Sequence, residues 1–367
     1  MRFVCTKDAL EKVLVVAERF TGKSVTLPIL GNFLIEAEKN TLTVTATNLE
    51  YAIQSSIVGH VGREGKVSVP AKIITSLIQS THDEKVDLEE KHGNLLVKTE
   101  TRNIKINGVS PDDFPLLPKI KKSFSCSVDA ALLSQGVGRV LPAVSISEFK
   151  PELNGILFHI SSGHIRLAAT DTFRLAESSW KLSKKRDRDE SFSFITPHRV
   201  VQEVGRFLAG RELEVKIAIG ENQILFETPG TAVFSRLIEG KFPEYSGIIP
   251  TTFETTSFLK RDHFVNAIRS SSIFSSKLQD VTVALSRDAV VLSTKNSEVG
   301  EYTTTLPAAT TGKDVTVNFN YRYLLDGLGV LEDEEIFIGC NAEGAPVLLR
   351  NKSNEDFLYV LMPIRFT

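Results

Sequence analysis

The feature that most constrains this chain is a threefold internal repeat. Three similar passages recur in the same order: LPILGNFLIEA (27–37), TLTVTATNLEYAIQSSI (41–57) and SVPAKIITSLIQ (68–79), then KPELNGILFHI (150–160), HIRLAATDTFRLAESSW (164–180) and FITPHRVVQEVGRFL (194–208), then SKLQDVTVALS (276–286), AVVLSTKNSEVGEYTTTL (289–306) and VNFNYRYLLDGLGVL (317–331). The period is roughly 120–135 residues, far longer than that of solenoid or propeller repeats, so each copy has the size of a domain. Chains built this way typically form a surface or an enclosure, and less often a single catalytic cleft.

The length and composition agree with this division. A chain of 367 residues with 42% hydrophobic residues is too long for one core and suits two or three domains. The proline-containing segments DDFPLLP (112–118) and KFPEYSGIIP (241–250) mark the ends of the first two copies. We therefore expect three domains, at residues 1–122, 123–251 and 252–367.

Each copy predicts two helices and several antiparallel strands, an α+β unit. The first helix of the first copy has apolar residues at helical spacing: Leu10, Val13, Leu14 and Ala17. Apolar residues then alternate as in strands: Leu42, Val44 and Ala46 in one copy, and Ile165, Leu167 and Ala169 in the next. A second helix is expected directly after Pro70, Pro197 and Asn320, because proline and asparagine both suit a helix N-terminus.

Charge and cysteine content exclude several classes of protein. The formal net charge is -2, so the chain is not coated in positive charge. Three cysteines without CxxC spacing argue against a disulfide framework or a cysteine-based metal site, and Cys5 and Cys126 are interpreted as half-buried hydrophobic residues. The mixed-charge run KKRDRDE (184–190) predicts a solvated loop. Because no run of about 18 apolar residues occurs, we expect a cytoplasmic protein without membrane contact.

One basic position recurs in every copy. Lys72, Arg199 and Arg322 each lie two residues after the residue that precedes the second helix. The first helices add further cations: Lys7, Lys12, Arg19, Arg139, Arg261 and Arg269. Such residues are compatible with ordinary surface charge, but if they faced one axis they would attract phosphates without reading bases.

Sequence patterns of catalytic sites are missing. GREGK (62–66) has the wrong spacing for a phosphate-binding loop, and no GxGxxG, HExxH or GxSxG pattern occurs. The seven histidines show no metal-ligand spacing, so no metal or cofactor is expected. Asp171 is the best candidate for a lone catalytic acid, but its counterparts Asn48 and Asn296 favour a role in an Asx-type turn. A hydrolase using Asp171 is the enzymatic alternative.

Several stretches together resemble the bacterial β sliding clamp family, the processivity subunit of the replicative DNA polymerase III. They span the chain in order: TLPILGN (26–32), ELNGILF (152–158), ATDTFRLA (169–176), KFPEY (241–245), FNYRYLLD (319–326) and YVLMPIR (359–365). The resemblance implies three clamp domains per chain and a non-catalytic head-to-tail homodimer that closes a ring around duplex DNA. Helices would line the hole, and antiparallel sheets would form the outside. The implied partners are the replicative polymerase catalytic subunit, the clamp loader and other proteins with clamp-binding motifs.

The resemblance also implies three sets of site residues. The pocket for client peptides, between the second and third domains, would contain Leu153, Thr170, Thr172, Arg174, Leu175, Pro243, Ile248, Leu278, Asn320, Tyr323, Pro346, Val360, Leu361, Met362, Pro363 and Arg365. The residues expected to face DNA are Lys12, Lys23, Lys72, Arg139, Arg199, Arg269 and Arg322. The dimer interface would join basic to acidic residues through Arg102, Ile104, Lys105, Ile106, Ile273, Glu298 and Glu301.

The chain departs from the family pattern at three places. Thr172-Phe173 replaces the usual Gly-His of the pocket, and Gly247 stands where a basic residue often lies. Ser24 occupies a position where the family often has a DNA-contacting arginine, with Lys23 adjacent. These differences concern peptide preference and one DNA contact. The alternative to a clamp is a repeat-built interaction scaffold that does not bind DNA.

Overall fold

The structure is a computed structural model that describes residues 1–117, 120–121, 123–147, 149–161, 163–182 and 191–365. The charged run at 184–190 lies outside the described residues. The chain forms two compact units. Unit 1 comprises Met1–Ala131 and Arg206–Leu237, and unit 2 comprises Leu132–Gly205 and Ile238–Thr367. Within the described ranges, no helix is both long and apolar enough to cross a membrane.

Unit 1 contains two antiparallel sheets. The first has five strands, in the spatial order β5 (His60–Arg63), β1 (Arg2–Thr6), β7 (Lys85–Lys91), β8 (Asn94–Lys98) and β9 (Asn103–Ile106). The second has eight, in the order β10 (Phe124–Asp129), β15 (Glu214–Ile219), β16 (Gln223–Thr228), β17 (Thr231–Arg236), β4 (Tyr51–Val58), β3 (Thr41–Thr47), β2 (Asn32–Glu38) and β6 (Gly65–Pro70). The predicted strand with Leu42, Val44 and Ala46 on its buried face is confirmed, because all three are fully buried. Thr45 and Thr47 are buried as well, so the alternation is limited to the first half of β3.

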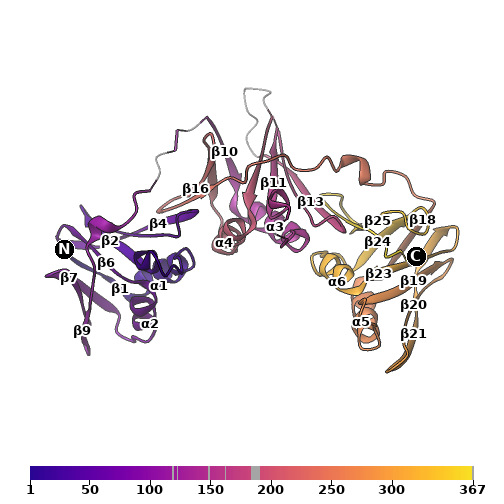
Figure 1. Ribbon diagram of the computed structural model, residues 1–367, viewed down its shortest axis with the longest axis horizontal. Helices are drawn as coiled ribbons and strands as arrows, with labels where there is room; N and C mark the ends of the chain where they lie inside the picture. The colour runs from indigo at the N-terminus through magenta and orange to yellow at the C-terminus, as the bar shows by residue number, and fades with distance from the viewer. Residues whose placement is uncertain (118–119, 122, 148, 162, 183–190, 366–367) are drawn as a thin grey trace. The chain divides into compact units, whose positions relative to one another are not determined.

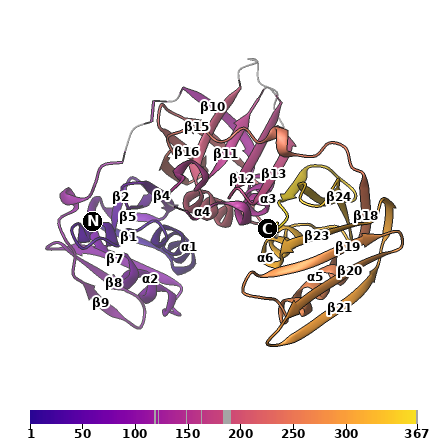
Figure 2. The ribbon, with the colours of Figure 1, turned by 45° about the vertical axis from the view of Figure 1, so that its right-hand side comes forward.

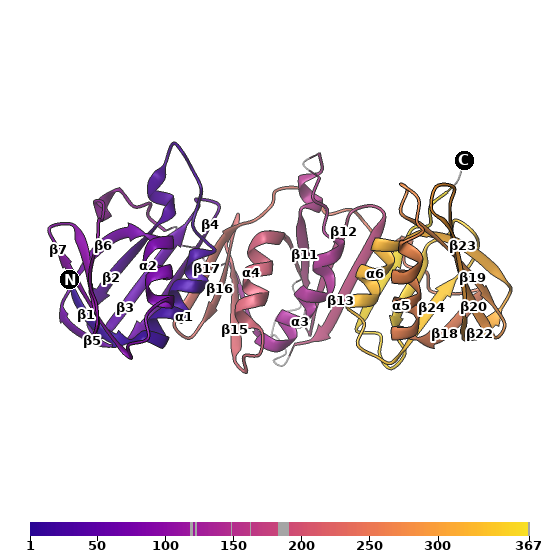
Figure 3. The ribbon, with the colours of Figure 1, turned by 90° about the horizontal axis from the view of Figure 1, so that it is seen from below.

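Two helices pack against each other in unit 1, α1 (Lys7–Glu18) and α2 (Ala71–Gln79) (Figures 1 and 3). The buried face of α1 consists of the four residues predicted from their spacing: Leu10, Val13, Leu14 and Ala17. The buried face of α2 consists of Ala71, Ile74, Thr75 and Ile78. Each helix is therefore amphipathic and leaves its opposite face to solvent.

Unit 2 also contains two antiparallel sheets (Figure 2). The larger has nine strands, in the order β14 (Phe192–Pro197), β11 (Gly155–Ile160), β12 (His164–Thr170), β13 (Arg174–Lys181), β26 (Phe357–Leu361), β25 (Val347–Asn351), β24 (Glu335–Cys340), β18 (Thr255–Lys260) and β22 (Ala309–Gly312). The smaller has four, in the order β21 (Gly300–Pro307), β20 (Ala289–Asn296), β19 (Asp280–Ser286) and β23 (Val315–Asn320).

The remaining helices are α3 (Ala130–Val140), α4 (His198–Leu208), α5 (Arg261–Ser272) and α6 (Tyr321–Gly329). Helices α5 and α6 pack side by side, as Figure 3 shows, and the Ser134 hydroxyl of α3 donates to the Gly205 carbonyl of α4 at 2.8 Å. As predicted, α2, α4 and α6 begin directly after Pro70, Pro197 and Asn320. The Asn320 side chain caps α6 by accepting from two backbone N–H groups of its first turn.

The large sheets join strands from different copies of the repeat. In unit 1, β4 of the first copy pairs with β17 of the second, and in unit 2, β13 of the second copy pairs with β26 of the third. The compact units therefore follow backbone pairing and divide the middle copy. The boundaries at residues 1–122, 123–251 and 252–367, which follow the repeat, stay a prediction.

Candidate functional site

The turn between β12 and β13 is held by Asp171. Its Oδ1 accepts hydrogen bonds from the backbone N–H groups of Phe173 and Arg174, each at 3.0 Å. The Thr170 hydroxyl donates to the Arg174 carbonyl at 2.7 Å and accepts from the Thr172 N–H at 3.1 Å. This geometry places Thr172 at a φ of 79°, in the left-handed region where a β-branched residue is rare.

The repeat counterparts of Asp171 have the same role, which confirms the predicted Asx-type turn. Asn48 accepts from the backbone N–H groups of Glu50 and Tyr51, and Asn296 accepts from that of Glu298. An amide is sufficient for these bonds. The position therefore requires a side-chain oxygen acceptor and not an acid, which argues against a catalytic role for Asp171.

A cluster of polar and aromatic side chains surrounds the Arg174 guanidinium. Its Nε contacts Asp171 Oδ2 at 2.9 Å, and its Nη1 contacts Asp326 Oδ2 at 2.5 Å. Nη1 also donates to the Tyr359 hydroxyl at 3.4 Å, and the guanidinium carbon lies 4.3 Å from the centroid of the Tyr323 ring. The Arg174 side chain is only 11% exposed. Because Arg174 lies on β13, Asp326 on α6 and Tyr359 on β26, their contacts connect these three elements through one paired cation.

The protonation states in this cluster follow from its contacts. Burial opposes the charge of Arg174, but Tyr359, Asp326 and Asp171 together raise its pKa above the ordinary value. Burial likewise raises the pKa of Tyr359, so its phenol stays neutral and donates to the Tyr323 carbonyl at 3.0 Å. Arg174 is therefore a permanent cation beside a neutral phenol.

The C-terminal segment continues across this cluster beyond β26. The Met362 N–H donates to the Phe173 carbonyl at 2.8 Å, which ties the segment to the β12–β13 turn. The Ile364 N–H donates to the Asn318 carbonyl, also at 2.8 Å, which ties it to β23. Two backbone hydrogen bonds thus hold the chain end against both the second and the third copy.

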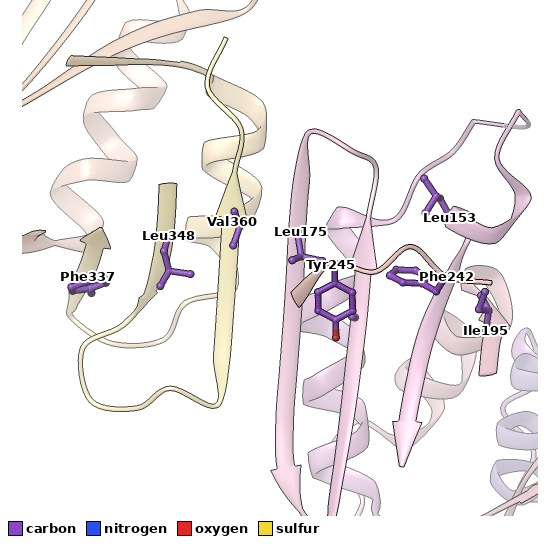
Figure 4. Packing of buried hydrophobic residues seen from close by; sticks show 9 residues of the cluster. Leu153, Leu175, Ile195, Phe242, Tyr245, Phe337, Leu348 and Val360 are labelled. Atoms are coloured by element: carbon purple, nitrogen blue, oxygen red, sulfur yellow. The ribbon is translucent and has the colours of Figure 1, made fainter. Parts of the chain in front are cut away.

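Three of the predicted pocket residues belong to a buried apolar cluster (Figure 4). Leu153, Leu175 and Val360 are each 1% exposed. The same cluster contains Ala168, Ile195, Phe242, Tyr245, Phe337 and Leu348. These side chains form a buried core within unit 2. Leu175 of β13 and Val360 of β26 are directly paired in the sheet.

Apolar side chains are also exposed around the cluster. Phe173 is 58% exposed and its ring stacks on Tyr323 with centroids 6.3 Å apart. Ile248 is 44% exposed and Leu278 is 62% exposed. An open hollow of about 650 Å³ lies beside the chain end and is lined by Glu343, Gly344, Ala345, Pro346, Met362, Ile364 and Arg365. Exposed apolar groups beside a few polar ones suit the anchors of an extended peptide.

Most of the other predicted pocket residues lie close to the Arg174 cluster, but Pro243 does not. The loop that carries Leu278 reaches the start of α6, because the Tyr321 N–H donates to the Gln279 carbonyl at 2.8 Å. Asn320, Leu361 and Pro363 lie at or next to residues described above: Leu361 is the strand partner of Arg174, and Pro363 follows Met362. Pro243 instead lines a separate hollow of about 370 Å³, to which residues 240–246 contribute part of the lining.

Sequence reasoning missed the partners of Arg174. Asp326 and Tyr359 contact its guanidinium, and Phe173 covers Tyr323. Asp326 ends the FNYRYLLD stretch. It lies three residues after Tyr323 on α6, a spacing that places the two side chains on the same face of the helix. That signal was present in the sequence, but its partner lies 152 residues away and only the fold brings the two together.

The residues predicted to face DNA are exposed with one exception. Lys12, Lys23, Lys72, Arg199, Arg269 and Arg322 are exposed. None of these six forms an ion pair within the described residues. Lys72, Arg199 and Arg322 are each the second residue of their helix, on α2, α4 and α6.

The prediction for Arg139 is wrong. Its side chain is 9% exposed, and its guanidinium pairs with Glu332 at 3.2 Å and lies over the Phe357 ring, 5.8 Å from the centroid. Arg139 is therefore a buried, paired cation within unit 2 and not an exposed one.

The residues predicted for the dimer interface lie at or beside two sheet edges. β9 is the last strand of the five-stranded sheet, with Arg102 and Lys105 exposed. Ile106 is 4% exposed, so its side chain belongs to the core of unit 1 and it offers the edge only its backbone. β21 is one edge strand of the four-stranded sheet, and its Glu301 is exposed. Ile104 lies on β9, whereas Glu298 precedes β21 and Ile273 follows α5.

Comparison with known proteins gives a consistent result along the whole chain. Family models of the DNA polymerase III beta subunit match its N-terminal domain at residues 1–118, its central domain at 127–244 and its C-terminal domain at 246–365. Proteins named beta sliding clamp are 27% identical in Synechocystis sp. (100% of this chain, 99% of the relative) and 25% identical in Bacillus subtilis (100% of both). The solved sliding clamp of Pseudomonas aeruginosa is 26% identical with a TM-score of 0.93, and a structure of it bound to griselimycin has 26% identity and a TM-score of 0.95, each covering 100% of both chains.

Proposed function

The chain belongs to the DNA polymerase III beta subunit family, the beta sliding clamps, and on this premise we propose that it encircles duplex DNA as a ring-shaped homodimer and holds the replicative polymerase on its template. Proteins of this family are non-catalytic processivity factors. The observation that carries the proposal is the match of all three domain models in order along one chain, at residues 1–118, 127–244 and 246–365.

The distribution of positive charge supports contact with a DNA backbone. Lys72, Arg199 and Arg322 occupy one position on the second helix of every copy, and all three are exposed. The 43 lysines and arginines are balanced by 45 acidic residues, so an overall positive charge does not explain this recurrence. Contacts of this kind attract phosphates without reading bases, so a ring could slide along any sequence.

The proposed dimer joins the two sheet edges described above, head to tail. Cations at Arg102 and Lys105 would meet the acids Glu298 and Glu301 of the partner subunit, and the β9 and β21 backbones would continue one sheet. Opposite charge favours this pairing over the pairing of two identical edges. An interface that joins different surfaces closes into a ring when its rotation permits.

The proposed docking site for clients is the Arg174 cluster with the exposed apolar groups around it. Clients would be the polymerase catalytic subunit, the clamp loader and other proteins that carry short clamp-binding segments. The related clamp of Pseudomonas aeruginosa has been solved with griselimycin bound. Phe173, Ile248 and Leu278 offer apolar contact, and Arg365 offers a cation at the chain end. We place the protein in the cytoplasm, where the chromosome is replicated.

Charge reversal distinguishes the clamp from a scaffold that does not bind DNA. In the variant Lys72→Glu, Arg199→Glu, Arg322→Glu, we expect weaker retention on DNA after loading and a shallower dependence on salt, because three phosphate contacts per chain are lost. The measurement is the amount of protein retained on nicked circular DNA over a series of salt concentrations.

The matched control reverses three exposed lysines on strands or turns: Lys39, Lys216 and Lys313. It changes the net charge equally but leaves α2, α4 and α6 intact. If the helix variant retained as much protein as the control, the scaffold hypothesis would replace the clamp.

A further inference from the structure

A second hollow lies in unit 1, at the junction of the first and second copies. It has a volume of about 280 Å³, which is enough for one or two side chains of a peptide. It is lined by residues of three segments: the turn between β3 and β4, residues 115–117, and the paired strands β16 and β17. Every lining residue belongs to unit 1, so its geometry is defined independently of unit 2.

The turn beside this hollow repeats the turn of the Arg174 cluster bond for bond. The Thr47 hydroxyl donates to the Tyr51 carbonyl at 2.9 Å and accepts from the Leu49 N–H at 3.0 Å, as Thr170 does in the second copy. Leu49 has a φ of 78°, against 79° for Thr172. The two turns therefore present their side chains in the same way.

The neighbouring strand is also repeated. The Arg236 N–H donates to the Glu50 carbonyl at 3.0 Å, as the Met362 N–H donates to the Phe173 carbonyl at 2.8 Å. Ser235 pairs with Tyr51 in the register in which Leu361 pairs with Arg174. Phe234 and Arg236 are thus the counterparts of Val360 and Met362, and Pro115 of DDFPLLP is the counterpart of Pro243 in the KFPEY segment.

The chemistry of the hollow differs from that of its counterpart in ways that open it. Ala52 replaces Leu175, which removes volume from the wall, and Tyr51 replaces Arg174, so no buried ion cluster forms there. Leu116 is 97% exposed and Leu49 is 48% exposed, which leaves apolar surface uncovered.

The polar edge of the hollow carries one cation. Gln223 and Arg236 are directly opposite each other on β16 and β17. Arg236 is exposed and has no ion pair among the described residues. Glu50 is the other charged lining residue, so a peptide with several acids would be repelled. One carboxylate next to an apolar anchor fits this arrangement.

We propose that this hollow is a second docking site, which takes an extended peptide whose aliphatic or aromatic anchor is followed by a single carboxylate. The anchor packs on Leu49, Leu116 and Phe234, and the carboxylate pairs with Arg236. The site goes beyond the proposed function and does not require ring closure.

The test uses the full chain and the peptide Gly-Leu-Phe-Asp-Gly-amide, which carries a neutral fluorophore on its N-terminus so that the aspartate is its one charged group, in fluorescence anisotropy titrations. We expect the double variant Leu116→Ser, Arg236→Ser to lose a binding event that remains in a matched variant of unit 2, Phe173→Ser, Met362→Ser. Replacing the peptide aspartate by lysine should weaken that same event by about fivefold or more, because the pair with Arg236 becomes a repulsion.

Leu116 and Arg236 are exposed, so the unit 1 variant should keep its fold, which circular dichroism and retention on DNA check. If all binding survives in the unit 1 variant, or is lost only in the unit 2 variant, the second site does not exist. Either outcome leaves the clamp proposal unaffected, because that proposal depends on retention on circular DNA and not on this peptide.

Discussion

At the scale of single residues, Thr172 is a β-branched residue in a left-handed backbone conformation, which is strained. A φ of 79° is unfavourable for a β-branched residue and comfortable for glycine. We expect Thr172→Gly to raise the free energy of unfolding by about 1 kcal/mol, because it removes this strain. Urea denaturation followed by circular dichroism measures the change.

The control for this substitution is Thr305→Gly, on the exposed face of β21. There glycine only loosens an extended strand, so stability should fall by about 0.5–1 kcal/mol. Equal effects at both positions would show that the turn at Thr172 is not strained.

Arg174 and Asp171 provide a second comparison at this scale. Arg174→Met should cost about 3 kcal/mol of stability, because it leaves the half-buried Asp171 carboxylate without its cation. Asp171→Asn keeps the oxygen that accepts from Phe173 and Arg174, so it should cost only about 1 kcal/mol. Chemical denaturation of both variants would contradict the account if Asp171→Asn were the more damaging.

The sequence predicted part of this site. The repeat alone identified Asp171, Asn48 and Asn296 as turn residues, because local hydrogen bonds need only neighbouring residues. The burial of Arg139 could not be predicted, since its partner Glu332 lies in the third copy and Phe357 comes from a distant strand. Side chains whose environment is set by another copy are the ones that the pattern along the chain misassigns.

At the scale of elements, the packing of α6 on β26 depends on a glycine. A Cβ atom at Gly327 would lie 2.4 Å from Cδ1 of the Tyr359 ring, which is fully buried. Gly327→Ala should therefore lower stability by about 2 kcal/mol and disturb the Arg174 cluster, since Tyr359 contacts that guanidinium.

Gly329 on the same helix is the matched control. A Cβ atom there meets nothing within 4 Å, so Gly329→Ala should stabilise the helix by about 0.5 kcal/mol. Thermal unfolding of both variants tests the pair, and a change of the same sign and size in both would show that contact with Tyr359 does not determine the effect at Gly327.

Elements were the most predictable level. Periodicity placed α1 and its buried face, and Pro70, Pro197 and Asn320 placed the starts of the second helices. The strand pairing between copies was not visible, because β4–β17 and β13–β26 join segments separated by more than one hundred residues. Pairing of distant edges depends on the folded sheet and leaves no local signature.

At the scale of the whole molecule, the repeat and the family agree on three clamp domains, and each copy has an exposed cation at the same position of its second helix, α2, α4 or α6. The proposed ring adds a topological property that no single contact provides. A closed ring stays on DNA because the DNA has no end, even when each phosphate contact is weak.

The most direct measurement compares retention on DNA before and after the circle is cut. The protein is loaded on closed circular DNA, separated from free protein, and measured again after a restriction enzyme linearises the circle. The account predicts stable retention on the circle and rapid release from the linear form. It also predicts loss of retention in the variant Glu298→Lys, Glu301→Lys, because this variant places cations opposite the cations of the proposed dimer interface. Retention that is equal on circular and linear DNA would contradict the ring.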